Sequence, residues 1–415
     1  MPKKLSITLA AAFAFALILC ACSNSEYADS SYYTIITAND DEVIESNNSN
    51  TDLSSSSSSI KEYLPLDDTE YPYAGIPRIV IETAKHQAIK DRETEIPAKL
   101  QIWGENKPES EIMDLTIRGR GNTSWTEMPK KSYKIEFINK QAILGMPKDR
   151  DWALIANYAD KTLMKNYLMY HLSAKLGAYY APRCEFAELY INREYLGVYL
   201  LTETIKIAKK RINIPENNES YIVEFDTRSQ KDDLIFHSSV YPTIEEIFRI
   251  HAPKNASTKT LSLIENHITN FENYIKKIDP NTNNHLEQWI DIEEFIKHYW
   301  IQEFSKNSDA WYHRSVFFSW EKDSLIKMGP VWDFDVAFGG QSSELQNKKY
   351  ENVSRLKPEG WFIILFHWNK FLFKDPILSE STKKYWKDNQ NIFINVFNDI
   401  DSTKKKYSCC SRKQF

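Results

Sequence analysis

The first half of the chain alternates apolar and polar residues with a period of two, which is typical of β-strands that bury one face. Apolar side chains occupy every second position in segments such as 98–103 and 132–137. A connection that contains two glycines joins two of these segments at 119–122, where the chain has to reverse. The predicted strands are 78–82, 98–103, 115–118, 132–137, 188–192, 195–201 and 219–227.

The second half changes to helical periodicity, with apolar residues three or four positions apart. One helix is also predicted in the first half, at 160–177, with Asp160 as its N-cap and Gly177 as its stop. The other predicted helices are 261–278, 292–304, 361–373 and 377–398. We therefore expect an α+β protein of two lobes, a β-rich N-terminal lobe with one long helix at 76–203 and a mainly helical C-terminal lobe at 204–415.

The N-terminus predicts export. Lys3 and Lys4 precede an apolar stretch at 5–21, which is short for a membrane span and suits a secretory signal. The end of this stretch, Leu-Cys-Ala-Cys, resembles a bacterial lipoprotein signal in which Cys22 carries the lipid. We predict a lipoprotein signal peptide at 1–22 and an exported protein, anchored at the periplasmic face or the cell surface. An ordinary signal peptide is the alternative.

Composition separates a tether from the folded part. Residues 23–75 are rich in Ser, Asn and Asp and include a run of six serines at 54–59. Such a segment buries too little apolar surface to offset the entropy of ordering, so we predict a disordered tether. The net charge of −5 and the lack of a long basic stretch argue against nucleic-acid binding. No second apolar run is long enough to span a membrane, so membrane contact is predicted through the lipid alone.

Three aspartates stand among aromatic and β-branched residues in the second half. Asp333 and Asp335 alternate with Phe334 and Val336, so in an extended segment both carboxylates point to one face. Two such carboxylates repel each other, and a hard divalent cation with oxygen ligands relieves the repulsion. Asp309 lies in a polar loop upstream. The alternative is an edge strand with a solvated acidic face.

Six short segments, in this order, resemble those of the CotH kinases, a family of atypical protein kinases named for a spore-coat protein. They are IRGRGNTSW at 117–125, PKKSYK at 129–134, ADKTL at 159–163, YLGVY at 195–199 with Thr202-Glu203, NSD at 307–309, and the segment 329–339. The resemblance covers roughly 76–389. It implies a two-lobed atypical protein-kinase-like fold, with ATP and Mg²⁺ as cofactors and a protein hydroxyl of Ser, Thr or Tyr as the acceptor.

The resemblance also implies a role for the glycine-bearing hairpin. Gly119 and Gly121 would lie over the nucleotide phosphates, because glycine lets backbone N–H groups come close. Arg118, Arg120 and Asn122 could add side-chain donors. A plain tight turn is the alternative for a glycine pair this short.

Lys134 or Lys131 would pair with the α- and β-phosphates, as a strand lysine does in protein kinases. The alternative for each is a solvated lysine on a strand face. The predicted helix at 160–177 carries no acid after its cap that could pair with this lysine. Glu203, after the last strand of the first half, could reach the ribose, or could simply be an exposed acid at a strand end.

Asp309 would be the catalytic aspartate that orients the attacking hydroxyl. Asp333 would hold Mg²⁺, with Asp335 as a second ligand or as a support of the loop. One position departs from the kinase pattern. Arg314, followed by Ser315, stands five residues after the aspartate, where protein kinases place a metal-binding Asn.

Two other functions fit the same residues. The aspartates could be the carboxylate pair of a hydrolase that acts on polysaccharide, with the abundant Trp and Tyr stacking on sugar rings. Arg314 in place of the metal-binding Asn could instead mark a kinase-like surface scaffold that no longer binds nucleotide.

Overall fold

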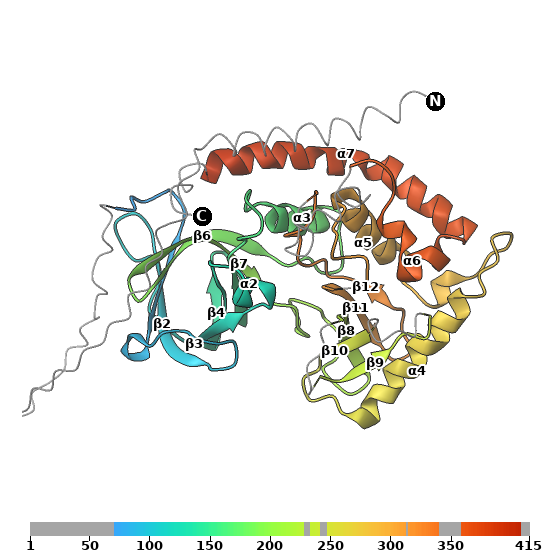
Figure 1. Ribbon diagram of the computed structural model, residues 1–415, viewed down its shortest axis with the longest axis horizontal. Coiled ribbons are helices and arrows are strands. Elements are labelled where there is room, and N and C mark those ends of the chain that lie inside the picture. The colour runs from blue at the N-terminus through green and yellow to red at the C-terminus, as the bar shows by residue number, and fades with distance from the viewer. Residues whose placement is uncertain (1–69, 228–232, 241–246, 313, 340–357, 408–415) are drawn as a thin grey trace, which may run out of the picture.

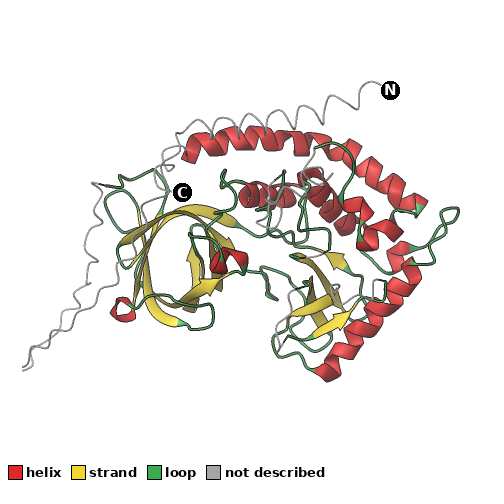
Figure 2. Cartoon of the chain, in the orientation of Figure 1, coloured by secondary structure: helices red, strands yellow, loops and turns green. Residues whose placement is uncertain are grey.

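The computed structural model describes residues 70–227, 233–240, 247–312, 314–339 and 358–407. The predicted signal peptide with Cys22, and nearly all of the predicted tether, lie outside these residues. The strands of the described chain gather in two groups, a barrel and a separate sheet (Figure 2). All strands of the barrel precede those of the separate sheet in the sequence.

Seven strands of the first half close into a barrel in the order β1-β2-β3-β4-β5-β7-β6. Neighbouring strands are antiparallel except where β1 pairs with β6 in parallel and closes the barrel, with Arg78 opposite Glu188. The alternating side chains of these strands, such as Ile135 and Phe137, are fully buried inside the barrel. The strands are β1 (Arg78–Thr83), β2 (Ile96–Trp103), β3 (Met113–Arg120), β4 (Ser132–Ile143), β5 (Met146–Ile155), β6 (Cys184–Ile191) and β7 (Glu194–Glu203).

The second group is an antiparallel sheet of five strands in the order β12-β11-β8-β10-β9. One face packs against helices, where the ring of Phe225 lies 5.1 Å from that of Trp368 between centroids. The other face carries Glu224, whose register partners are Arg249 on one side and Phe317 on the other. The strands are β8 (Ser220–Phe225), β9 (Ile235–His237), β10 (Ile247–Ala252), β11 (Val316–Glu321) and β12 (Lys327–Met328).

Helices cover the second sheet and run along one side of the molecule (Figure 1). α3 packs mainly against α5 and α7, and α4 packs against α6. The helices are α2 (Thr123–Thr126), α3 (Lys165–Lys175), α4 (Thr258–Ile275), α5 (Ile292–Ser305), α6 (His367–Leu372) and α7 (Pro376–Tyr407), and the 3-10 turns are η1 (Ala84–His86), η2 (Leu286–Gln288) and η6 (Ile363–Leu365). Within the described ranges, we find no helix that combines the length and the apolar character needed to cross a membrane.

The prediction of a two-lobed kinase-like fold with a mainly helical C-terminal lobe is wrong. The first half forms a closed barrel, and the second half contributes a whole sheet, β8 to β12, besides its helices. The missed strand β10 (IFRIHA) alternates apolar and polar residues only over the five positions from Phe248, and β11 (VFFSWE) opens with three consecutive apolar residues. Apolar runs this short are not separated from buried helix by periodicity alone. The long helix of the first half belongs with the helices of the second, because α3 packs on α5 and α7.

Candidate active site

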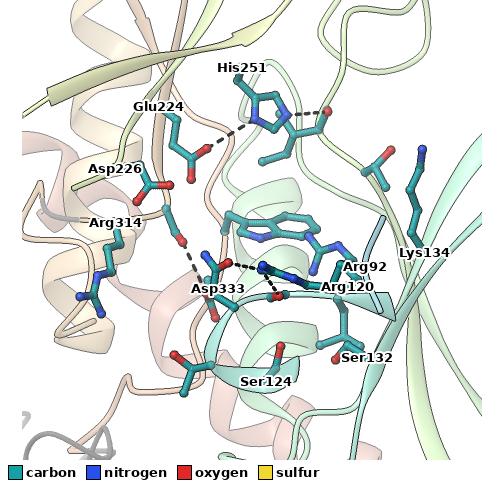
Figure 3. A pocket seen from close by; sticks show the side chains of 18 of the residues that line it. Arg92, Arg120, Ser124, Ser132, Lys134, Glu224, Asp226, His251, Arg314 and Asp333 are labelled. Atoms are coloured by element: carbon teal, nitrogen blue, oxygen red, sulfur yellow. Dashed lines mark hydrogen bonds and ion pairs between the residues drawn. The ribbon is translucent and has the colours of Figure 1, made fainter. Parts of the chain in front are cut away.

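A cavity of about 1400 Å³ lies between the barrel and the second sheet. Both halves of the chain line it. Figure 3 shows Arg120 and Lys134 on one side of this space, Glu224 and Asp226 on the other, and Asp333 between them. Of the residues predicted from the sequence, the cavity is lined by Arg118, Arg120, Gly121, Asn122, Lys134, Asp309, Asp333 and Asp335.

The acidic segment that follows β12 is an irregular loop, and the predicted extended strand with two carboxylates on one face is wrong there. Asp333 has φ of 59°, a left-handed conformation that is uncommon for residues other than glycine. The loop brings both Asp333 and Asp335 to the cavity even so. A residue from another loop restrains this strained backbone: the Asn307 side chain donates to the Asp333 carbonyl over 2.9 Å.

The carboxyl group of Asp335 is held among other acids. Burial, together with the nearby carboxylates of Asp333 and Asp160, raises its pKa to about 8. The Asn166 side chain donates a hydrogen bond of 2.6 Å to Asp335 and opposes this shift in part. A cluster of this kind has a negative potential that a cation would relieve.

Asp309 lies in the loop after α5, beside the acidic loop. Two hydrogen bonds join the loops: Ser308 Oγ donates to the Val336 carbonyl over 3.2 Å, and Phe338 N donates to the Ser305 carbonyl over 2.7 Å. The cavity position of Asp309 is therefore tied to that of the acidic loop.

Packing explains the two glycines of the hairpin after β3. A Cβ at Gly119 would lie 2.6 Å from the Trp125 ring and 2.7 Å from the Asp91 carbonyl, so a side chain does not fit. Gly121 has φ of 95° and its carbonyl accepts a 2.9 Å hydrogen bond from Arg92, a cavity residue that sequence patterns did not indicate. Gly119 itself does not line the cavity.

Arg118 and Arg120 both lie on β3, but their side chains have different surroundings. The Arg118 guanidinium donates to the Arg92 carbonyl and lies 3.7 Å from a carboxylate oxygen of Glu95. Arg120 lies over the Trp332 ring, 5.2 Å from its centroid, and faces the cavity. Burial lowers the pKa of Arg120, and Tyr170 and Asp333 work against that shift.

The two candidate lysines also differ. Lys134 lines the cavity and forms ion pairs with Glu136 at 2.9 Å and with Asp151 at 3.1 Å, so its acidic partners come from strands and not from a helix. Lys131 does not line the cavity, and its ammonium group donates to the Trp125 carbonyl over 2.6 Å.

Glu203 does not line the cavity either. It is 1% exposed and accepts hydrogen bonds from Arg183 at 2.7 and 3.0 Å, with Arg211 3.6 Å away. The residues directly after it, 204–207, line the cavity instead.

The second sheet supplies a charged wall that the sequence interpretation missed. Arg249 pairs with Asp226 at 3.0 Å and also with Glu224. His251 lies 3.4 Å from Glu224 and 3.0 Å from the Ile205 carbonyl. The only signal for this wall in the sequence was the acid-x-acid pattern of Glu224 and Asp226, at the end of the predicted strand 219–227. Asp333 and Asp335 have the same spacing.

The position that departs from the kinase pattern also faces the cavity. Arg314 and Ser315 both line it. The Ser315 hydroxyl donates to an Asp333 carboxylate oxygen over 3.4 Å, and Ser315 itself has φ of 56°. A serine hydroxyl, one residue after the position where the kinase pattern has an Asn, thus contacts the candidate metal ligand.

The described residues contain no group of three or more His, Cys, Asp or Glu side chains that could hold a metal on their own. Mg²⁺ at nucleotide sites is usually held by one or two carboxylates together with phosphates and waters. Asp333 and Asp335, on one cavity wall, fit that donor set. The residues are therefore suited to a Mg²⁺ ion shared with a phosphate group.

The family model of the CotH kinase protein matches residues 117–408, which is more than half of the chain. The match begins within β3, so β1 and β2 precede it although both belong to the barrel. A search of curated proteins found no match.

Proposed function

The chain belongs to the CotH kinase protein family, and on this premise we propose that it is an ATP- and Mg²⁺-dependent protein kinase. One observation carries the proposal: Arg120 from the barrel and Asp309 and Asp333 from the second half line the same cavity. Cations and carboxylates on opposite sides of one space suit a metal-bound triphosphate. The acceptor is a Ser, Thr or Tyr hydroxyl of an exported or surface protein.

Residues of the barrel bind the phosphates. Arg120 is held over Trp332 with its guanidinium toward the cavity, where it supplies charge-assisted hydrogen bonds. Lys134, paired with Glu136 and Asp151, adds a second cation whose side chain is already held in place. Arg92 supports this wall by holding the Gly121 carbonyl.

Asp309 orients the acceptor hydroxyl and takes its proton as the reaction proceeds. The hydroxyl oxygen forms a bond to the γ-phosphorus, the bond from that phosphorus to the β,γ-bridging oxygen breaks, and ADP leaves. Asp333 would hold Mg²⁺ at this place, and the bound ion would neutralise charge on the phosphate oxygens. Catalysis rests on positioning and electrostatics, because phosphoryl transfer leaves little covalent work for side chains.

Transfer from ATP labelled in its γ-phosphate tests the proposal. The purified protein is incubated with Mg²⁺ and a peptide library that contains Ser, Thr and Tyr. Label in peptide or in the protein itself, lost on removal of Mg²⁺, is the expected result. No label and no nucleotide binding would favour the scaffold, and release of sugar from polysaccharide without nucleotide would favour the hydrolase.

We also propose that the protein is an exported lipoprotein, anchored through Cys22, without nucleic-acid partners. The signal-like N-terminus supports this localisation. Metabolic labelling with a fatty-acid analogue would attach label to the wild type and not to Cys22→Ser. Labelling of both proteins alike would contradict the proposed anchor.

A further inference from the structure

Asn166, on α3, binds the acidic loop by its side chain alone. Its Nδ2 atom donates to the Asp335 carboxylate over 2.6 Å, and its Oδ1 atom accepts from the Phe334 backbone N–H over 2.8 Å. The same Nδ2 atom donates to Asn157 Oδ1 over 2.9 Å. Asn166 is 2% exposed, so these contacts are shielded from water. An amide with one donor and one acceptor side thus holds both the backbone and the carboxylate of the loop.

The turn before α3 places this amide. Asp160 accepts from the Lys165 backbone N–H over 2.9 Å and from the Thr162 side chain over 2.7 Å. Asn157 donates to the Leu163 carbonyl over 3.1 Å. Because these bonds fix where the helix starts, they also fix the direction of its second residue, Asn166.

The Asn166 side chain contacts the part of the acidic loop whose backbone is strained. Asp333 has φ of 59°, and its neighbour Phe334 donates to Asn166. Lys165, also on α3, donates to the Asp335 carbonyl over 3.1 Å. A non-glycine residue keeps such a conformation only where its surroundings over-determine it, and α3 supplies part of that restraint.

We propose that Asn166 is a positioning residue of the metal–nucleotide site, which fixes the loop so that the Asp333 carboxylate is presented to the cavity and Asp335 supports it. This inference rests on the proposed kinase function. Partners of metal ligands orient those ligands, and their loss typically weakens metal binding by about 10- to 100-fold. Loss of a residue that only packs would lower stability. Loss of a positioning residue is expected to lower metal affinity as well, by more than the loss of stability explains.

The experiment measures Mn²⁺ binding by electron paramagnetic resonance, in the presence of a non-hydrolysable ATP analogue, together with the unfolding temperature. Asn166→Ala should weaken Mn²⁺ binding about tenfold or more and leave metal-free nucleotide binding unchanged. Asn389→Ala is the matched control. Asn389 is also a helical asparagine, its Nδ2 atom donates to the Tyr385 carbonyl over 3.0 Å, and it does not line the cavity.

A charge-conserving exchange, Asn166→Asp with Asp335→Asn, keeps an amide–carboxylate pair with reversed polarity. We expect it to bind Mn²⁺ more tightly than the single variant Asp335→Asn, which lacks the same carboxylate, and this comparison remains measurable if Asn166→Ala fails to fold. Wild-type metal affinity in a folded Asn166→Ala protein, or an exchange variant that binds Mn²⁺ no better than Asp335→Asn, would overturn the inference while leaving the kinase proposal intact. Wild-type protein that binds no nucleotide would instead overturn the proposed function, and the inference with it.

Discussion

The side chain of Asn307 donates a 2.9 Å hydrogen bond to the backbone carbonyl of Asp333. This bond joins the loop after α5, which carries Asp309, to the loop that carries the candidate metal ligand. Two loops from separate parts of the second half therefore behave as one structural unit on the cavity wall. A kinase needs such a link, because the acceptor hydroxyl and the metal-bound phosphate have to meet at a set distance.

Asp309→Asn should lower kcat by roughly a hundredfold or more, since it removes the proton acceptor and keeps the size of the side chain. Binding of Mg-ATP, followed by thermal shift, should stay close to that of the wild type. The rate is measured as transfer of labelled γ-phosphate. Asp323→Asn, at an exposed position between β11 and β12, is the control. An unchanged rate in Asp309→Asn would remove this residue from the chemistry.

Arg120→Ala should weaken ATP binding about tenfold or more, because it removes a charge-assisted contact to phosphate. Lys134→Ala should cost less, since Lys134 already pairs with Glu136 and Asp151 in the free protein. Titration calorimetry with a non-hydrolysable analogue compares the two variants. A larger loss in Lys134→Ala would make Lys134 the main phosphate contact in place of Arg120.

Ser315→Asn should strengthen Mg²⁺ binding several-fold. Ser315 has φ of 56°, a conformation that Asn adopts more readily than most residues, and its hydroxyl already contacts Asp333. An amide oxygen there would add a hard ligand of the kind that protein kinases use. Mn²⁺ titration measures the gain, and Ser315→Ala should show none. Equal affinities in all three proteins would mean that this position does not face the metal.

The barrel illustrates what sequence patterns can and cannot predict. Alternation identified β2 and β4 because side chains such as Ile135 and Phe137 enter a sealed interior while their neighbours do not. Closure could not be predicted, because it depends on β1 pairing with β6, far along the chain. The missed strands β10 and β11 alternate over only four or five residues each, and a run this short does not separate a strand from a helix.

The site, too, was predicted where local sequence is informative and missed where contacts between distant segments decide. The family resemblance offered Arg120, and residue chemistry pointed to Asp309, Asp333 and Asp335; all four line the cavity. It could not distinguish Lys134 from Lys131, because only the folded barrel shows which of them lines that cavity.

Positioning residues were harder to predict. Asn166 acts through contacts between distant segments, for which its local sequence carries no signal. The wall around Glu224 had only the acid-x-acid pattern of Glu224 and Asp226 as a signal.

Stability should fall in mild acid because of a buried histidine in α5. Burial lowers the pKa of His298 to about 4 from its ordinary value of 6.5. The unfolded chain therefore binds more protons, and stability present above pH 6.5 is lost as the pH drops toward 4. At pH 5, protonation of this residue in the unfolded chain lowers the free energy of unfolding by about 2 kcal/mol relative to neutral pH.

Urea unfolding at several pH values measures the loss. His298→Leu should reduce the dependence between pH 6.5 and 4 by its share, since burial also lowers the pKa of His267 and of His367. His285→Gln, at a side chain that is 54% exposed, should leave it unchanged. A His298→Leu protein with the wild-type pH dependence would contradict the assignment.

A thermal-shift titration with ATP, with and without Mg²⁺, on wild type and Asp333→Ala tests the central claim most directly. A ligand that binds only the folded protein must raise its unfolding temperature. We predict a shift of the wild type by ATP that grows when Mg²⁺ is added, and the loss of this added part in Asp333→Ala. A wild type that ATP does not stabilise, or an Asp333→Ala protein with the full Mg²⁺-dependent shift, would contradict the account.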